Sequence, residues 1–346
     1  MWRITSRPES FPAVAGAVAA VAEADGDISA SQREWLDELA RRHDMMSMPR
    51  PARDARLRRA RPRSCPSGTQ EGRKPGGYWE DSPWPYSWTV EDVAQALPDQ
   101  DERRCLVRHL VLIALLDARV DEAEIEVVEA FARGLAVSHP AVATLRTFKK
   151  GRTRALTRQL FAGSFIASLM RRIWKQDGLS GAWRIARAVA RMRDRHKAAR
   201  YQALGSLPEG TLGRVLHDHC RANGFAFPGE RRGTPEILLF HDVGHALTGR
   251  GADAVGEVGM AGFEAGFMGD DDAYSIALFG LYAFGVGAPV IPDFETRAGD
   301  FEVEAFTSAY AEGETVDEDL RFWDPWPSME RPVSEVRRAL GMGKRV

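Results

Sequence analysis

The chain has 346 residues, with 47 Lys or Arg against 49 Asp or Glu, and 44% of its residues are apolar. This composition is typical of a soluble globular protein, and the length favours two domains. A net charge of −2 excludes a strongly basic nucleic-acid-binding protein, so we expect no nucleic-acid partner. Cys65, Cys105 and Cys220 are too few and too widely spaced for a disulfide framework, which favours a cytoplasmic location.

The first 148 residues contain a repeated helical hairpin. The turn Ala-Asp-Gly-Asp-Ile-Ser at 24–29 separates two helix-like stretches, and Leu-Asp-Ala-Arg-Val-Asp at 116–121 separates two more. Each turn ends on a residue that favours the N-cap of the next helix, Ser29 or Asp121. Two such hairpins can bury their apolar faces against each other, which predicts one folded domain.

The acidic turn at 24–29 lacks the twelve-residue spacing and terminal glutamate of a calcium loop, so a capped helix–helix turn is favoured. The segments at about 11–48 and 101–148 resemble the tellurite-resistance-B-like helical domains, whose hairpins carry an Ala-Asp-Gly-x-Ile/Val-Ser turn. The resemblance implies metal sensing or binding through such turns. The second copy departs from the pattern at Ala118 and Arg119.

Two apolar stretches have membrane-related alternatives. Residues 11–22 follow Arg3 and Arg7 and resemble a secretory signal, but the repeat favours a helix inside a domain. Residues 276–292 are too short and too often broken by glycine and proline for a spanning helix, which needs about 20 residues. We expect this segment to be re-entrant, surface-lying or buried.

Residues 49–100 are rich in Pro, Gly, Arg and Trp and predict a linker. We therefore divide the chain into an interrupted hairpin-repeat domain, 1–148, and a helical bundle, 149–346, which makes the fold class all-α.

Residues 149–200 contain 15 basic and two acidic side chains. In this stretch we predict a helix over 183–200 that gathers four arginines on one face, Arg184, Arg187, Arg191 and Arg195. Such a helix lies either on an anionic membrane surface or on the solvated face of a bundle.

The densest group of potential metal ligands is His241-Asp242-Val243-Gly244-His245, followed by Glu257. Thr234-Pro235-Glu236 predicts the start of a helix, and the glycines near residue 251 predict a turn into a second helix ending near 268. Histidines four residues apart project from one face of a helix. Because His245 and Glu257 are equally far from the turn, they lie at the same height in an antiparallel hairpin.

Two imidazoles and one carboxylate predict a site for Zn²⁺, with Mn²⁺, Fe²⁺ or Co²⁺ as alternatives. Asp242 takes the position of the glutamate in H-E-x-x-H, so it is a candidate fourth ligand, an orienter of a histidine, or a catalytic proton acceptor. His217-Asp218-His219 predicts only a polar surface, because residues two apart on a helix point away from each other.

The spacing His241-Asp242-x-x-His245-x(11)-Glu257 resembles the H-D-x-x-H-x(11)-E signature of the Coq-four family of ubiquinone-biosynthesis proteins. Upstream and C-terminal segments agree, and the resemblance covers about 160–346. It implies a helical protein, often a homodimer, that is peripherally membrane-associated, works with other quinone-biosynthesis proteins and binds a polyprenyl lipid beside its metal. Departures from the family are Gly244, the acidic run at 270–272 and the fused front domain.

The implied activity is removal of the C1 carboxylate from a polyprenylated 4-hydroxybenzoate-type quinone precursor, coupled in some accounts to hydroxylation. In this metal-dependent lyase, Asp242 or a metal-bound water delivers a proton to C1. Phe263, Phe267 and Phe279, together with 276–292, would line a channel for the isoprenoid tail. Two alternatives stay open: a lipid-binding scaffold with a structural metal, and a metal-dependent hydrolase.

Overall fold

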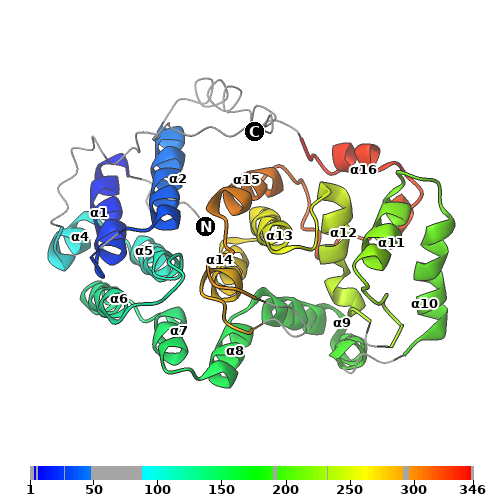
Figure 1. Ribbon diagram of the computed structural model, residues 1–346, viewed down its shortest axis with the longest axis horizontal. Coiled ribbons are helices and arrows are strands. Elements are labelled where there is room, and N and C mark those ends of the chain that lie inside the picture. Colours follow the sequence, from blue (N-terminus) through cyan, green and yellow to red (C-terminus); the bar gives the residue numbers. More distant parts are fainter. Residues whose placement is uncertain are drawn as a thin grey trace. The chain divides into compact units, whose positions relative to one another are not determined.

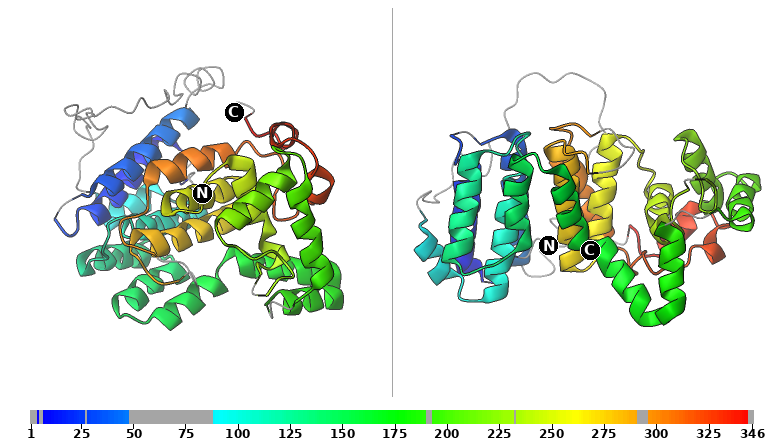
Figure 2. Two further views of the ribbon diagram at one scale, coloured as in Figure 1. Left: turned by 45° about the vertical axis from the view of Figure 1, so that its right-hand side comes forward. Right: turned by 90° about the horizontal axis from the view of Figure 1, so that it is seen from below.

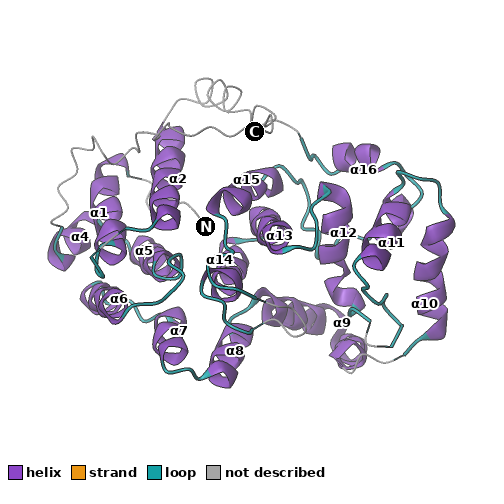
Figure 3. Ribbon diagram, in the orientation of Figure 1, coloured by secondary structure: helices purple, strands orange, loops and turns teal. Residues whose placement is uncertain are grey.

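The structure, a computed structural model, describes residues 4, 7–26, 28–47, 88–189, 193–231, 233–290 and 296–343. Across these residues the regular elements are helices, and no strand occurs beyond two isolated bridges (Figure 3). The predicted all-α class is therefore confirmed. None of the described helices combines the length and the apolar character needed to cross a bilayer.

The chain divides into two compact units. Unit 1 comprises the residues up to Gln159 together with Leu281–Gly299, and unit 2 comprises Leu160–Gly280 and the described residues from Asp300 onward. The predicted boundary at 148/149 therefore lies one helix too early. The segment 281–299, which we assigned to the second domain, packs with the first.

Unit 1 begins with two pairs of helices that follow the repeat. Its helices, labelled in Figure 1, are α1 (Phe11–Ala22), α2 (Ala30–Ser47), α4 (Val90–Ala96), α5 (Gln100–Ile113), α6 (Glu122–Gly134), α7 (Pro140–Lys149) and most of α8 (Thr153–Ala162). The apolar stretch 11–22 is α1, and almost every residue in it is buried. Gly16 of α1 lies against an aromatic ring, since a Cβ there would come within 2.4 Å of Trp88.

The two hairpin turns are capped in the same way. The Ser29 hydroxyl accepts from the Gln32 amide at 3.3 Å, and the Gln32 side chain accepts from the Ser29 amide at 2.9 Å. Asp121 and Glu124 form the equivalent capping box on α6. The predicted caps are thus confirmed, while Asp27 of the first turn lies outside the described residues. Gln32 also donates to the Glu124 carboxylate at 3.0 Å, which joins the two copies of the repeat.

Glu124 is fully buried at this junction. Burial raises the pKa of Glu124 to about 8. One acidic side chain of each turn is paired with a cation of the chain itself, since Arg119 lies 3.2 Å from Asp25 and 3.6 Å from Asp117. This ion pairing fits the capped-turn interpretation.

The predicted linker ends earlier than residue 100. Thr89 and Asp92 form a capping box that begins α4, and Val93 and Leu97 are fully buried. The Thr-x-x-Asp signal and these apolar side chains therefore build a short helix where we expected linker. Residues 48–87, which contain Cys65 and the rest of the predicted linker, lie outside the described part of the chain.

The segment 281–299 completes unit 1. The Tyr282 hydroxyl donates to the Thr144 hydroxyl at 2.7 Å, and the Tyr282 ring packs on Phe148 with centroids 5.7 Å apart. Gly285 lies against backbone, because a Cβ there would come within 2.4 Å of the Leu115 carbonyl oxygen.

Unit 2 holds the remaining helices. These are α9 (Phe165–Val189), α10 (Arg195–Gln202), α11 (Leu212–Ala222), α12 (Leu239–Thr248), α13 (Ala254–Phe267), α14 (Asp270–Gly280), α15 (Val303–Gly313) and α16 (Val333–Ala339). The single helix predicted over 183–200 is wrong: α9 ends at Val189, and Asp194 caps a new helix by accepting from the Lys197 amide at 3.0 Å. The four arginines therefore do not share one helix face, and Arg191 lies outside the described residues.

Helices α13 and α15 pack so closely that only glycine fits at two positions of their contact. A Cβ at Gly262 would lie 2.1 Å from the Phe306 carbonyl oxygen, and a Cβ at Gly313 would lie 2.1 Å from that of Phe263. Both views of Figure 2 show the yellow α13 and the orange α15 side by side. This contact fixes the helix that carries Glu257.

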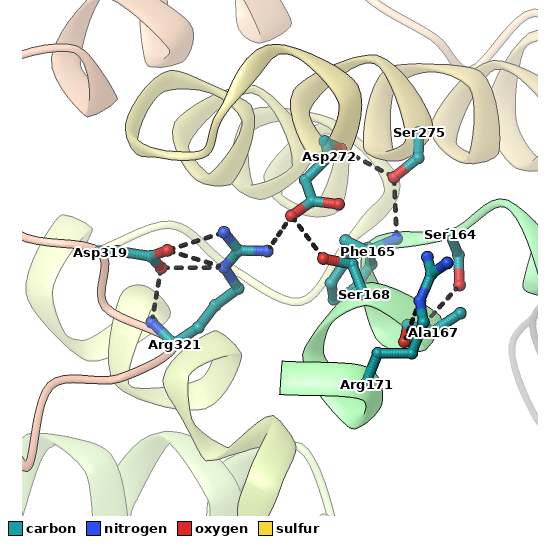
Figure 4. A network of polar contacts seen from close by, with 9 residues as sticks. All are labelled: Ser164, Phe165, Ala167, Ser168, Arg171, Asp272, Ser275, Asp319 and Arg321. Atoms are coloured by element: carbon teal, nitrogen blue, oxygen red, sulfur yellow. Dashed lines mark hydrogen bonds and ion pairs between the residues drawn. The ribbon is translucent and has the colours of Figure 1, made fainter. Parts of the chain in front are cut away.

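A buried arginine ties α9 and α14 to the loop after α15 (Figure 4). The Arg321 guanidinium donates to Asp272 at 2.6 Å and to Asp319 at 2.7 Å. Asp272 also accepts from the Ser168 hydroxyl at 3.1 Å. One member of the acidic run at 270–272 therefore has a structural role.

Candidate metal centre

The predicted helical hairpin is present, with shifted ends. A short 3-10 turn, Glu236–Leu238, precedes α12, so the α-helix begins later than the Thr-Pro-Glu signal suggested. Gly249 ends α12 in the left-handed conformation, at φ 75°. Asp253 then caps α13 by accepting from the Gly256 amide at 2.8 Å. The hairpin brings α12 and α13 together over the five-residue loop 249–253, as the sequence predicted.

His241, His245 and Glu257 form a compact group that could hold a metal ion. The two Nε2 atoms lie 3.2 Å apart, and the Glu257 oxygens lie 3.3 Å from His241 Nε2 and 3.5 Å from His245 Nε2. In a tetrahedral site with bonds of about 2.0–2.1 Å, ligand atoms are separated by about 3.3–3.4 Å. The two Nε2 atoms therefore have nearly the spacing that one such ion requires, and each has a different Glu257 oxygen within 3.5 Å.

Hydrogen bonds fix both imidazole rings. His241 Nδ1 lies 2.7 Å from Glu264 Oε1, and His245 Nδ1 lies 3.0 Å from the Arg250 carbonyl oxygen. Acceptors at both Nδ1 atoms favour the tautomer that leaves Nε2 with a free lone pair, which is the usual arrangement of metal-binding histidines. Glu264, buried and two helical turns after Glu257, was not predicted, although this spacing on one helix face is a signal that could have found it.

The charges of the group favour a bound cation. Burial opposes protonation of His241, but Glu264 and Glu257 raise its pKa well above the usual value. Burial likewise disfavours the Glu257 carboxylate, yet hydrogen bonds from the two imidazoles hold its pKa well below the usual range. A metal ion would therefore replace a proton held between these side chains.

Exposure differs among the three side chains. His245 is fully buried and Glu257 is 16% exposed, whereas the His241 side chain is 35% exposed. Among the three side chains, solvent therefore reaches the group chiefly at His241.

Ion pairs brace the loop that supplies the Arg250 carbonyl. Glu312 of α15 pairs with Arg250 and with Arg337 of α16, each at 2.9 Å. Arg337 also donates to the Leu247 carbonyl oxygen at the end of α12, where a cation is favourable. The C-terminal helix therefore helps to hold the backbone acceptor of His245.

Gly244, which departs from the resembled family, allows close approach of α13. A Cβ at this position would lie 2.4 Å from the terminal methyl group of Met260. The space that a larger side chain would take is filled by Met260, with Phe263 3.8 Å from the same position.

Asp242 does not join the group of ligand atoms in the described part of the chain. It is buried, and burial raises its pKa. Its charge acts on the Cys220 thiol of α11, whose pKa rises to about 12 chiefly through burial. Neighbouring residues on a helix point in different directions, so the side chains of His241 and Asp242 lie in different environments. The roles of orienter and proton carrier stay predictions.

His219 lies beside the group, although we expected it to be surface. Its ring stacks on that of His245, with centroids 4.6 Å apart. Burial and the neighbouring His245 lower the pKa of His219 to about 4. Asp218 does match the surface prediction, whereas His217, which pairs with it at 3.0 Å, is half-buried against Phe227. His219 reaches the metal group because α11 packs on α12, and no local sequence pattern could have predicted that position.

A cavity of about 520 Å³ lies on another face of α12. Leu239 and Val243 line it, and they project from the side of the helix opposite His241 and His245. Its other walls come from α9, α10 and the loops at 228–237 and 320–326. A molecule in this cavity is separated from the metal group by α12.

The predicted lipid-binding phenylalanines do not line this cavity. Phe263 is fully buried and packs on Phe267 with centroids 5.5 Å apart, so it fills the core of unit 2. Phe279 is half-buried against Phe161. A role for Phe267 and Phe279 in lipid binding stays a prediction. Residues 291–292 of the predicted channel segment lie outside the described residues.

A comparison of the chain with models of protein families and with curated proteins finds no match.

Proposed function

We propose that the protein is a metal-dependent lyase whose divalent ion, zinc by the chemistry of the donors, is held by His241, His245 and Glu257. The supporting observation is the two Nε2 atoms 3.2 Å apart, each with a Glu257 oxygen within 3.5 Å, and both Nδ1 atoms already hydrogen-bonded. Two nitrogens and one carboxylate are the ligands of many catalytic zinc sites, which keep one position open, whereas structural sites use four protein ligands. The three-ligand set and the exposed His241 therefore favour catalysis over a scaffold.

The substrate class comes from the resemblance to the Coq-four family, and we infer decarboxylation at C1 of a polyprenylated 4-hydroxybenzoate-type acid. When bound, the ion would stabilise negative charge on substrate oxygens as CO₂ leaves. Glu264 and the Arg250 carbonyl would keep the two imidazole planes fixed during the reaction. Asp242, which is buried on the same helix but outside the group of donors, is kept as the candidate carrier of the proton that C1 takes up.

Helix α9 supports contact with a membrane surface, where such a substrate resides. Trp174, Leu179 and Trp183 are 53%, 84% and 62% exposed. Gly178, at φ 55°, kinks α9 between Trp174 and Leu179, and Arg171 and Lys175 are exposed on the segment that carries Trp174. Interfacial tryptophans beside basic side chains favour an anionic bilayer surface. We infer that α9 docks there while the metal group receives the aromatic head of the lipid.

The test uses the purified full-length chain. We expect about one zinc per chain by elemental analysis, and loss of CO₂ from a polyprenyl-4-hydroxybenzoate in detergent micelles by mass spectrometry. His241→Ala should abolish both, and His217→Ala, at a half-buried histidine outside the group, should leave both unchanged. Zinc retained at the wild-type level by His241→Ala would disprove the site. Stoichiometric metal and bound lipid without product would instead support the scaffold.

A further inference from the structure

His219 of α11 contacts the metal group, and none of the roles assigned above uses it. Its ring lies on the face of His245, with centroids 4.6 Å apart and planes inclined by 19°. His245 in turn has its Nε2 atom 3.2 Å from that of His241 and 3.5 Å from a Glu257 oxygen. His219 therefore borders the metal group through its contact with His245.

The Nε2 atom of His219 is buried and has no hydrogen-bond partner among the described residues. Leaving such an atom unsatisfied costs about 1–3 kcal/mol, so native proteins usually supply water, an ion or a ligand. His217, two residues earlier, provides the contrast, because its Nδ1 pairs with Asp218 and its ring packs on Phe227. Of these two histidines of α11, His219 is the one with a buried nitrogen that has no partner among the described residues.

His219 is not itself one of the donors that cluster around the prospective ion. Its nitrogen is thus better suited to a molecule bound at the ion than to the ion. The metal group has an open side at His241, where an oxygen ligand would bind.

We propose that His219 is a positioning residue of the metal centre. Its ring holds the plane of His245, and its Nε2 hydrogen-bonds the oxygen ligand, water or a substrate carboxylate, at the open position. This inference rests on the proposed metal site.

The test replaces zinc with Co²⁺, whose visible absorption reports its coordination, and adds azide as a small anionic ligand. His219→Phe keeps a ring that can stack but removes the nitrogen, and His219→Ala removes both. His217→Ala is the matched control. We expect His219→Phe to bind Co²⁺ but to lose at least about tenfold in azide affinity, as expected for a lost hydrogen bond to a charged group. His219→Ala should in addition bind Co²⁺ about tenfold more weakly.

An unchanged Co²⁺ spectrum and azide affinity in His219→Phe would overturn the inference and leave the metal site standing. A wild-type chain that binds no Co²⁺ would overturn the metal site, and the inference with it. If His219→Phe does not retain Co²⁺, His219→Gln decides: azide affinity near wild type supports the inference, and a loss equal to that of His219→Ala overturns it.

Discussion

Among single residues, Glu264 has the sharpest predicted effect on the metal group. Its carboxylate accepts from His241 Nδ1 at 2.7 Å and is buried. Glu264→Gln keeps the shape of the side chain but removes the negative charge that holds His241. We expect metal affinity to fall about 10–100-fold, the usual effect of losing such a partner. Competition with a chromophoric chelator measures this. Glu304 is exposed on α15, so Glu304→Gln is the control and should bind metal like the wild type.

Glu124 predicts a pH dependence of stability in unit 1. Its pKa is raised from 4.5 to about 8 in the folded protein, so folding favours the protonated acid. The stability gained from this preference is complete below pH 4.5 and is lost as the pH rises through about 8. Glu124→Gln imitates the protonated form, so its melting temperature should fall less than that of the wild type between pH 5 and 9. Glu126→Gln, exposed on the same helix, should follow the wild-type curve. Parallel curves for all three proteins would contradict the prediction.

The residues of the metal group were predictable wherever helix geometry fixed them. His241 and His245 share a face because they are four residues apart, and the loop sets Glu257 at the same height. Asp242 was predicted from motif position alone, although an adjacent helical residue points elsewhere. His219 comes from α11, so only tertiary packing brings it to the group.

At the scale of helices, the close contact of α13 and α15 predicts that added methyl groups disturb the site. Gly262→Ala or Gly313→Ala would place a Cβ about 2 Å from a backbone carbonyl of the facing helix, so the helices must separate. We expect a loss of about 1–3 kcal/mol in the free energy of unfolding, typical of overpacking, and weaker metal binding because α13 carries Glu257. Thermal denaturation and metal titration test both effects. Gly269→Ala, where a Cβ meets nothing within 4 Å, should behave like the wild type.

Helix ends were less predictable than helix existence. The caps at Ser29 and Asp121 follow from sequence because each stands before an apolar helical pattern. The break before Asp194 was missed because the spacing of arginines suggested continuity, although an aspartate three residues before Lys197 is itself a cap signal. Burial of Val93 and Leu97, which made α4 a helix, depends on contacts with the rest of unit 1.

At the scale of the whole molecule, the metal group lies within unit 2, so we expect zinc to stabilise that unit and not unit 1. Zinc that binds at the proposed site stabilises the residues folded around it, by about 2.7 kcal/mol at a concentration of 100 times Kd. Hydrogen exchange followed by mass spectrometry should show added protection in α12 and α13, and none in α1 or α5. The His241→Ala protein should show no change in either unit. Protection gained in the turn at 24–29 would instead indicate a metal site in unit 1.

The placement of 281–299 limits how this gene can be divided. Tyr282 supplies a hydroxyl to Thr144 and an aromatic face to Phe148, so the front unit depends on a peptide encoded far downstream of its main body. A fragment truncated after codon 159 would lack that peptide and leave an uncovered hydrophobic recess. Recombination that exchanges the front unit between genes would therefore need two compatible crossovers.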